Sequence, residues 1–162
     1  MAAKAVYNGL MSASHDSAGP PAEAAEPADQ LARGVSRLLS EMGFACLTEF
    51  RLKSGRRADV AGLDRKGRIV IVEIKRSLQD FRADAKWPEY LDYCDNFYFA
   101  TPKAFPHEVL PGAHGLILAD RFGAAVVRPA AALAPLHASR RRELTLRFAL
   151  GAADRLTGLL DP

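Results

Sequence analysis

Residues 57–75 read RADVAGLDRKGRIVIVEIK, and this stretch decides the fold. Its second half contains an unbroken β-branched run, Ile69 to Val72, which favours a strand buried on both faces. Two charged residues stand at the end of this strand, Glu73 and Lys75, on either side of Ile74. Because side chains alternate along a strand, Glu73 and Lys75 point to one face and therefore share a site.

The loop Arg65–Gly67 predicts how this strand pairs with the segment before it. Gly67 can supply the positive φ that a three-residue hairpin loop with a bulge requires, so Arg57–Leu63 should run antiparallel to the charged-ended strand. Starting from 64 opposite 68, this register places Asp59 directly opposite Glu73. Cross-strand Cβ atoms lie about 4.5–5.5 Å apart, where two carboxylates repel unless a cation separates them. Hard oxygen ligands of this kind suit Mg²⁺, so the hairpin predicts a metal site.

The rest of the chain supplies a helix before this hairpin and further strands after it. Asp29 is the expected N-cap of a helix over residues 30–42, which carries an apolar stripe of 3.6-residue period. After the Glu73 strand, Ser77 should open a short turn and Pro88 should begin a helix. Ser139 is the expected N-cap of the last helix, which begins at residue 140. The expected strands span residues 44–53, 57–63, 69–75, 96–100, 115–119 and 124–128.

The hairpin and the segment after it resemble a known family. Asp59, followed after thirteen residues by Glu73-Ile74-Lys75, looks like the signature of the PD-(D/E)xK nuclease superfamily. More narrowly, the run from Arg57 through Glu73-Ile74-Lys75-Arg76-Ser77 to Lys86-Trp87-Pro88-Glu89-Tyr90-Leu91-Asp92-Tyr93-Cys94-Asp95 resembles bacterial MmcB-type DNA repair proteins. Ala58 stands where the superfamily name has proline.

This resemblance implies an α/β fold of restriction-endonuclease-like type. We expect an αβββαβ core in which helices flank a mixed sheet. Residues 29–162 should form this single domain, since the length suits one core. Residues 1–28 are rich in Ala, Ser, Pro and Gly and are expected to be a flexible tail.

Charge and cysteine content indicate a nucleic-acid partner and a reducing compartment. The chain carries a net charge of +3, and the domain is its basic part because residues 1–29 hold one lysine against four carboxylates. Cys46 and Cys94 have no metal-ligand spacing around them and should be reduced core residues. With no apolar run of membrane-spanning length and no leader pattern, we expect a cytoplasmic protein without membrane contact.

The resemblance also implies roles for residues around the hairpin. Asp59, Glu73 and the backbone carbonyl of Ile74 would hold Mg²⁺ or Mn²⁺, and Lys75 would position or deprotonate the attacking water. Superfamily members often add a glutamate from the first helix or strand, for which Glu49 is preferred over Glu41.

Several basic residues are candidates for contacts with DNA phosphates, and a solvated surface position is the alternative for each, preferred for those of the last helix. Those nearest the hairpin are Lys53, Arg57, Arg76 and Lys86, and the last helix contributes Arg140 and Arg141. Trp87, Tyr90 and Tyr93 are assigned to packing in preference to base stacking.

The sequence therefore predicts a Mg²⁺-dependent deoxyribonuclease that acts on DNA in repair, with other repair proteins as further partners. The repair setting comes from the resemblance alone. The alternative is a catalytically silent DNA-binding or scaffold module that keeps the fold and recruits repair proteins. Neither the DNA structure recognised nor the oligomeric state follows from the sequence.

Overall fold

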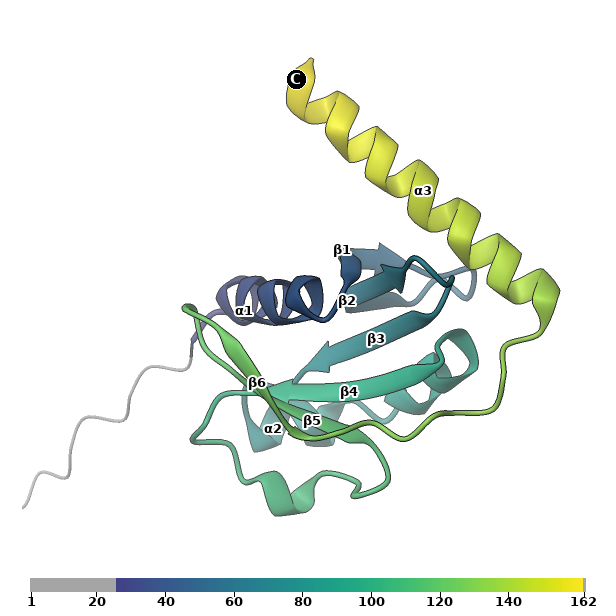
Figure 1. The fold of residues 1–162 in the computed structure, drawn as a ribbon. Helices are drawn as coiled ribbons and strands as arrows, with labels where there is room; N and C mark the ends of the chain where they lie inside the picture. The colour runs from purple at the N-terminus through teal and green to yellow at the C-terminus, as the bar shows by residue number, and fades with distance from the viewer. Residues whose placement is uncertain (1–25, 162) are drawn as a thin grey trace, which may run out of the picture.

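One six-stranded sheet forms the centre of the computed structural model, which describes residues 26–161 (Figure 1). The strands lie in chain order across the sheet. The first three form an antiparallel meander, the next two continue in parallel, and the last returns antiparallel. They are β1 (Phe44–Arg51), β2 (Arg57–Asp64), β3 (Ile69–Ile74), β4 (Asn96–Thr101), β5 (Gly115–Ala119) and β6 (Ala124–Arg128).

The helical segments complete the expected αβββαβ order. α1 (Ala28–Glu41) precedes the meander, and α2 (Leu78–Ala83) with the 3₁₀ helix η1 (Trp87–Tyr93) connects β3 to β4. A second 3₁₀ turn, η2 (His107–Val109), precedes β5, and α3 (Ala138–Leu160) ends the chain. The mixed sheet flanked by helices confirms the predicted fold class. Residues 1–25 of the expected tail lie outside the described residues.

Helix α1 covers one face of the sheet with the predicted apolar stripe. Leu31, Val35 and Leu39 are fully buried and pack with Val60 and Val72 in what we call the α1 core. Helix α1 lies very close to the β5–β6 turn, because a Cβ added at Gly34 would lie 2.3 Å from the Asp120 carbonyl oxygen. Only glycine fits this position without moving the backbone of the β5–β6 turn.

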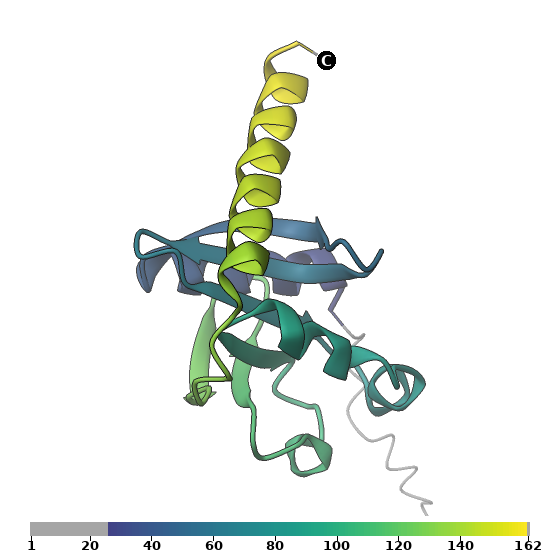
Figure 2. The ribbon, with the colours of Figure 1, turned by 90° about the vertical axis from the view of Figure 1, so that its right-hand side faces the viewer.

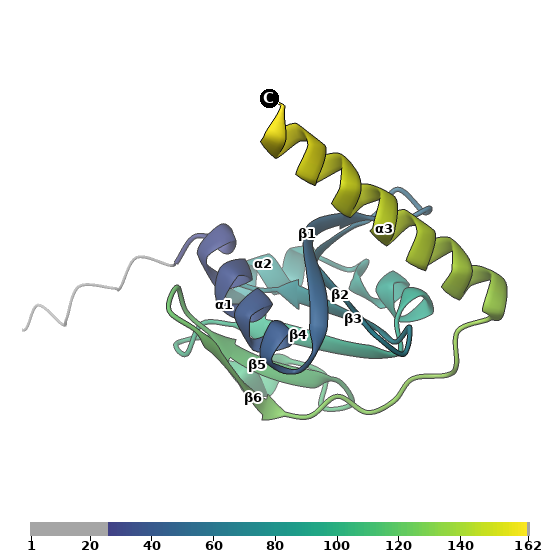
Figure 3. The same cartoon turned by 45° about the horizontal axis from the view of Figure 1, so that its top comes forward.

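The opposite face carries a second core, here called the α3 core. Ile71, Phe97 and Phe99 pack there with Leu144 and Phe148 of α3. The helix lies against β1 and then extends beyond the sheet (Figures 2 and 3). Its distal leucines are largely exposed, namely Leu150, Leu156, Leu159 and Leu160.

Three expected helix starts differ from the structure. Pro27 precedes α1, so Asp29 lies in the first turn and is not the N-cap. The segment around Pro88 is a 3₁₀ helix that begins at Trp87. His137, whose ring nitrogen accepts from the Ser139 amide, is the N-cap of α3 in place of Ser139. The Ser77 cap of α2 is confirmed by the hydrogen bond that its hydroxyl accepts from the Asp80 amide.

The β2–β3 turn has the expected geometry. Gly67 has φ +77°, and its amide donates to the Asp64 carbonyl at 3.0 Å, while the Asp64 amide donates to the Arg68 carbonyl. The ladder pairs Leu63 with Ile69 and Val60 with Val72, which confirms the predicted register.

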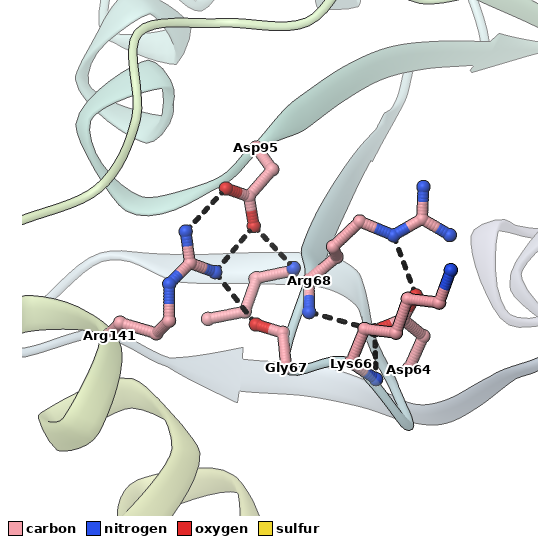
Figure 4. A network of polar contacts seen from close by, with 7 residues as sticks. Asp64, Lys66, Gly67, Arg68, Asp95 and Arg141 are labelled. Carbon is pink, nitrogen blue, oxygen red and sulfur yellow. Dashed lines mark hydrogen bonds and ion pairs between the residues drawn. The ribbon is translucent and has the colours of Figure 1, made fainter. Parts of the chain in front are cut away.

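A polar network ties this turn to two distant segments (Figure 4). The Arg141 guanidinium on α3 makes a two-point contact with the Asp95 carboxylate, at 2.7 and 2.8 Å. It also donates to the Gly67 carbonyl, while Asp95 accepts from the Ile69 amide. The hydrogen bond from Arg141 holds the pKa of Asp95 below its ordinary value. Arg141 therefore serves to fasten the hairpin, a structural role that the sequence had not indicated.

We predict that Arg141→Met lowers the free energy of unfolding by about 1–2 kcal/mol, because it removes charged hydrogen bonds that are only partly exposed to water. Arg142→Met is the matched control, since Arg142 is exposed and forms no ion pair within residues 26–161. Urea titration of both variants measures the effect. Equal stability of the two would show that the network contributes nothing.

Candidate active site

Asp59, near the start of β2, and Glu73, near the end of β3, lie side by side on neighbouring strands. Two residues inward from Glu73, Ile71 belongs to the α3 core, and alternation extends that face to Glu73. The charge of Asp59 acts directly on the Glu73 carboxyl group, which places Asp59 beside it. Asp59 Oδ2 accepts from the Ile74 amide at 2.7 Å, which anchors it beside the end of β3. The structure thus brings the two predicted acids together.

Lys75 follows on the same face and is almost fully buried, with 3% of its surface exposed. Its ammonium contacts Glu73 Oε1 at 3.3 Å and Asp84 Oδ2 at 2.5 Å. Asp84 lies at the C-terminal end of α2, so the Ser77-capped helix returns the chain to the site. Two carboxylates thereby fix the direction in which the ammonium points.

Burial and mutual repulsion dominate the electrostatics of the acid pair. Burial, followed by the charge of Asp59, raises the pKa of Glu73 to about 8. Burial also raises the pKa of Asp59, although the Ile74 N–H and the Lys75 charge act in the opposite direction. The second Glu73 oxygen, Oε2, is buried and has no hydrogen-bond partner among the described residues. The Lys75 ammonium, which Glu73 shares with Asp84, does not offset burial and repulsion enough to let both groups ionise.

In the Lys75–Asp84 pair, by contrast, the contact between opposite charges favours the ionised form of both groups. Burial lowers the pKa of Lys75, but the hydrogen bond with Asp84 and the charge of Glu73 outweigh burial and raise it above the ordinary value. Burial likewise opposes ionisation of Asp84, yet the Lys75 contact leaves its pKa below normal. Lys75 is therefore a cation at neutral pH.

The donors fit a hard divalent cation. Since the Ile74 N–H points toward Asp59, its carbonyl points to the same edge of the strand, as in any extended residue. A buried and a half-buried carboxylate, the buried one with an oxygen that has no partner among residues 26–161, and a carbonyl are oxygen ligands of the kind that Mg²⁺ and Mn²⁺ prefer. Within residues 26–161, however, no three His, Cys, Asp or Glu side chains cluster as a metal-binding group.

Glu49, the candidate third acid, lies on β1 opposite Asp59, between the pairs Thr48–Val60 and Phe50–Ala58. Its carboxylate forms an ion pair with Arg57 at 2.5 Å and is half exposed. Glu41, the other candidate, is at the end of α1, which covers the opposite face of the sheet. Glu49 thus remains a prediction, whereas Glu41 is not placed at the site.

The basic candidates divide into two groups. Lys53, Arg76 and Lys86 are exposed and form no ion pair in the described part of the chain. Arg57 contacts Glu49, as above, whereas Arg140 and Arg141 make structural contacts. Arg140 donates to the Asp92 carbonyl and lies over the Tyr93 ring, and Arg141 holds the β2–β3 turn. Contacts of any of these residues with DNA remain predictions.

The aromatic residues after β3 form part of the core, as predicted. Trp87 stacks on Phe97 with ring centroids 5.7 Å apart, and Tyr90 is 5% exposed. The Tyr90 hydroxyl donates to the Arg57 carbonyl at 2.9 Å and so ties η1 to the start of β2.

Two polar residues near this site have no local sequence pattern that assigns them a role. Asp84 lies in a stretch of loop character, where only the Ser77 cap indicates a short helix that returns the chain to the strand end. Thr101 ends β4, one residue beyond the Ile74–Ala100 pair, and is fully buried, with a hydroxyl that has no hydrogen-bond partner within residues 26–161. No local pattern marks Thr101, because its burial comes from the parallel crossover.

The αβββαβ order, with an acid pair and a lysine at the strand ends, defines a protein of restriction-endonuclease-like fold. The chain belongs to the MmcB-like DNA repair protein family, whose profile matches residues 16–162. No helix within residues 26–161 has both the length and the apolar character needed to cross a membrane.

Two solved structures resemble the chain. SPO1766, a protein of unknown function from Silicibacter pomeroyi, shares 45% identity over 85% of this chain and 93% of its own, with a TM-score of 0.81. A repair endonuclease from Pyrococcus abyssi shares 22% identity over 48% of this chain and 38% of its own, with a TM-score of 0.35. No curated protein sequence matches the chain.

The raised pKa of Glu73 predicts a stability that depends on pH. With its pKa raised to about 8, Glu73 holds its proton up to about pH 8 when folded, but ionises near its ordinary pKa of 4.5 when unfolded. Unfolding therefore releases a proton between these values, and raising the pH favours the unfolded state. We expect the metal-free protein to lose about 1–3 kcal/mol of unfolding free energy between pH 5 and pH 8.

Glu73→Gln should remove most of this loss, whereas Glu108→Gln, on an exposed side chain of η2, should retain it. Urea titrations at several pH values, in EDTA, provide the measurement. A Glu73→Gln variant with the wild-type pH profile would contradict the assignment.

Proposed function

We propose that the chain is a Mg²⁺- or Mn²⁺-dependent deoxyribonuclease that acts in DNA repair. The observation that carries the proposal is the buried Glu73 carboxyl group, which has an oxygen without a partner in the described part of the chain, a neighbouring half-buried Asp59 and a raised pKa. A purely structural acid at this depth would have its hydrogen bonds satisfied. A carboxyl pair whose repulsion is not relieved by the one neighbouring ammonium is instead what a metal-binding site looks like before the ion binds.

The ion would be held by Asp59, Glu73 and the Ile74 carbonyl, with Glu49 as a candidate fourth ligand. When bound, a divalent ion supplies charge neutralisation at the scissile phosphate and a bound water of lowered pKa. The protein prepares for this by holding Asp59 against the Ile74 amide and Glu73 against Lys75. Both carboxylates therefore need little reorganisation to act as ligands.

Lys75 acts as a fixed positive charge in this proposal. Its raised pKa makes it a poor general base, so positioning the attacking water and stabilising the transition-state charge are its better roles. Glu73 and Asp84 hold the ammonium beside the acid pair. The exposed cations Lys53, Arg76 and Lys86 would contact DNA phosphates around the site, and Arg57 would do so after release from Glu49.

The second candidate is a catalytically silent DNA-binding or scaffold module that recruits other repair proteins. It is favoured by one observation, the absence within residues 26–161 of a third acid gathered with the Asp59–Glu73 pair. A weak or non-catalytic ion site would leave the fold and the basic surface in place.

Cleavage assays separate the two candidates. We expect the full chain to cut one or more of single-stranded, nicked, branched or lesion-bearing DNA in Mg²⁺ or Mn²⁺, and not in EDTA. Glu73→Gln and Lys75→Met should each lower the rate by about 10²-fold or more, because each removes a charge used in the transition state.

Glu108→Gln serves as the control, since its exposed side chain lies on η2 and should leave cleavage unchanged. DNA binding without cleavage of any substrate, equal in wild type and both site variants, would establish the scaffold candidate instead.

A further inference from the structure

Glu49 has a strained backbone. Its φ of +53° makes it the only non-glycine residue with positive φ in the described part of the chain. The left-handed conformation places Cβ close to the backbone and is costly for residues other than Gly, Asn and Asp. Such strain persists only where surrounding contacts enforce it, so the contacts around Glu49 reveal what holds it.

The strain changes which β1 side chains face α3. Leu47 and Phe50 both pack in the α3 core, although residues three apart on a regular strand point to opposite faces. The left-handed Glu49 between them breaks the alternation. Phe50 thereby meets Phe148 of α3, with ring centroids 5.7 Å apart.

One face of α3 covers this part of β1. Leu144 and Phe148 are buried in the α3 core, and a Cβ added at Gly151 would lie 3.8 Å from Leu47 Cδ1. Arg155 comes next at helical spacing on the same face. Its guanidinium donates to the Thr48 carbonyl at 2.5 Å and to the Glu49 carbonyl at 3.4 Å. The helix therefore holds the Thr48 and Glu49 carbonyls, one on each side of the Glu49 Cα atom.

The side chain of Glu49 lies near Asp59, because after burial the charge of Glu49 also raises the pKa of Asp59. Its carboxylate forms an ion pair with Arg57, two residues before Asp59 on β2, and the residue itself lies opposite Asp59 in the register. A regular β1 would pair Glu49 with Asp59 through the ladder. In the observed structure Glu49 and Asp59 are not paired in the β1–β2 ladder. The Glu49 carbonyl instead accepts a hydrogen bond from Arg155 of α3.

We propose that Arg155 is a positioning residue, which holds Glu49 in its left-handed conformation and so lets α3 determine where the Glu49 carboxylate lies beside the Asp59–Glu73 pair. The inference deepens the proposed function and rests on it only for the contribution of Glu49 to metal binding. The link between α3 and the β1 backbone stands on the contacts alone.

The first test needs no metal. In the full chain in EDTA, Arg155→Met should speed amide hydrogen exchange at the protected positions of residues 47–51 by about tenfold relative to wild type. Arg147→Met is the control, because the ion pair that Arg147 forms in the described part of the chain is with Glu143, one turn away on α3 itself, and it should leave these rates unchanged. Arg155→Lys retains one charged donor and should restore part of the protection.

A second variant distinguishes positioning from general support of the fold. Glu49→Asn places a residue that tolerates the left-handed region, so the backbone needs less help from Arg155. In that background Arg155→Met should change the exchange of residues 47–51 by no more than about twofold. Equal acceleration in both backgrounds, or no acceleration in either, would overturn the proposal.

Calorimetric titration with Mn²⁺ tests the link to the site. Arg155→Met should bind Mn²⁺ about tenfold more weakly than Arg147→Met, equivalent to about 1.4 kcal/mol. Equal affinity of the two variants would overturn the link between α3 and the ion site. Wild type that binds no Mn²⁺ would instead refute the proposed function, and the exchange experiment would still decide whether Arg155 holds the Glu49 backbone.

Discussion

The register of the β2–β3 hairpin is the constraint on which the candidate site depends. Side chains alternate with a period of two, so a slip of one residue would move Asp59 to the α1 face and leave Glu73 alone. The Gly67 turn sets this register locally, and Asp95 and Arg141 fasten the turn from β4 and α3. A loop far from the acids thus determines whether they meet.

The site also concentrates destabilising features that the rest of the molecule offsets. The buried Glu73 carboxyl group lies beside the half-buried Asp59, and Glu49 on the next strand has a strained backbone. Stable proteins tolerate such features where function needs a prearranged group. The two apolar cores on either side of the sheet supply the stability, and the charged contacts of Lys75 keep its ammonium buried without leaving it unpaired.

Local sequence patterns predicted the hairpin, and long-range contacts account for what they missed. The β-branched run, Gly67 and the alternation of side chains were enough to place Asp59, Glu73 and Lys75 on one face. Asp84 and Arg155 reach their partners through the crossover and the last helix, which no local pattern encodes. The left-handed backbone at Glu49 is equally invisible in the sequence, since nothing near it favours positive φ.

The exposed end of α3 has a consequence for limited proteolysis. Beyond Arg155 the last turn carries Leu156, Leu159 and Leu160 in contact with solvent, and a helix without packing is marginally stable, so this end should fray and be nicked first. A cut after Thr157 would remove solvent-exposed leucines and keep Arg155, with its hydrogen bonds to β1. A cut only a few residues earlier would release Arg155, so two fragments of almost equal mass would differ in whether the strand beside the acid pair is still held.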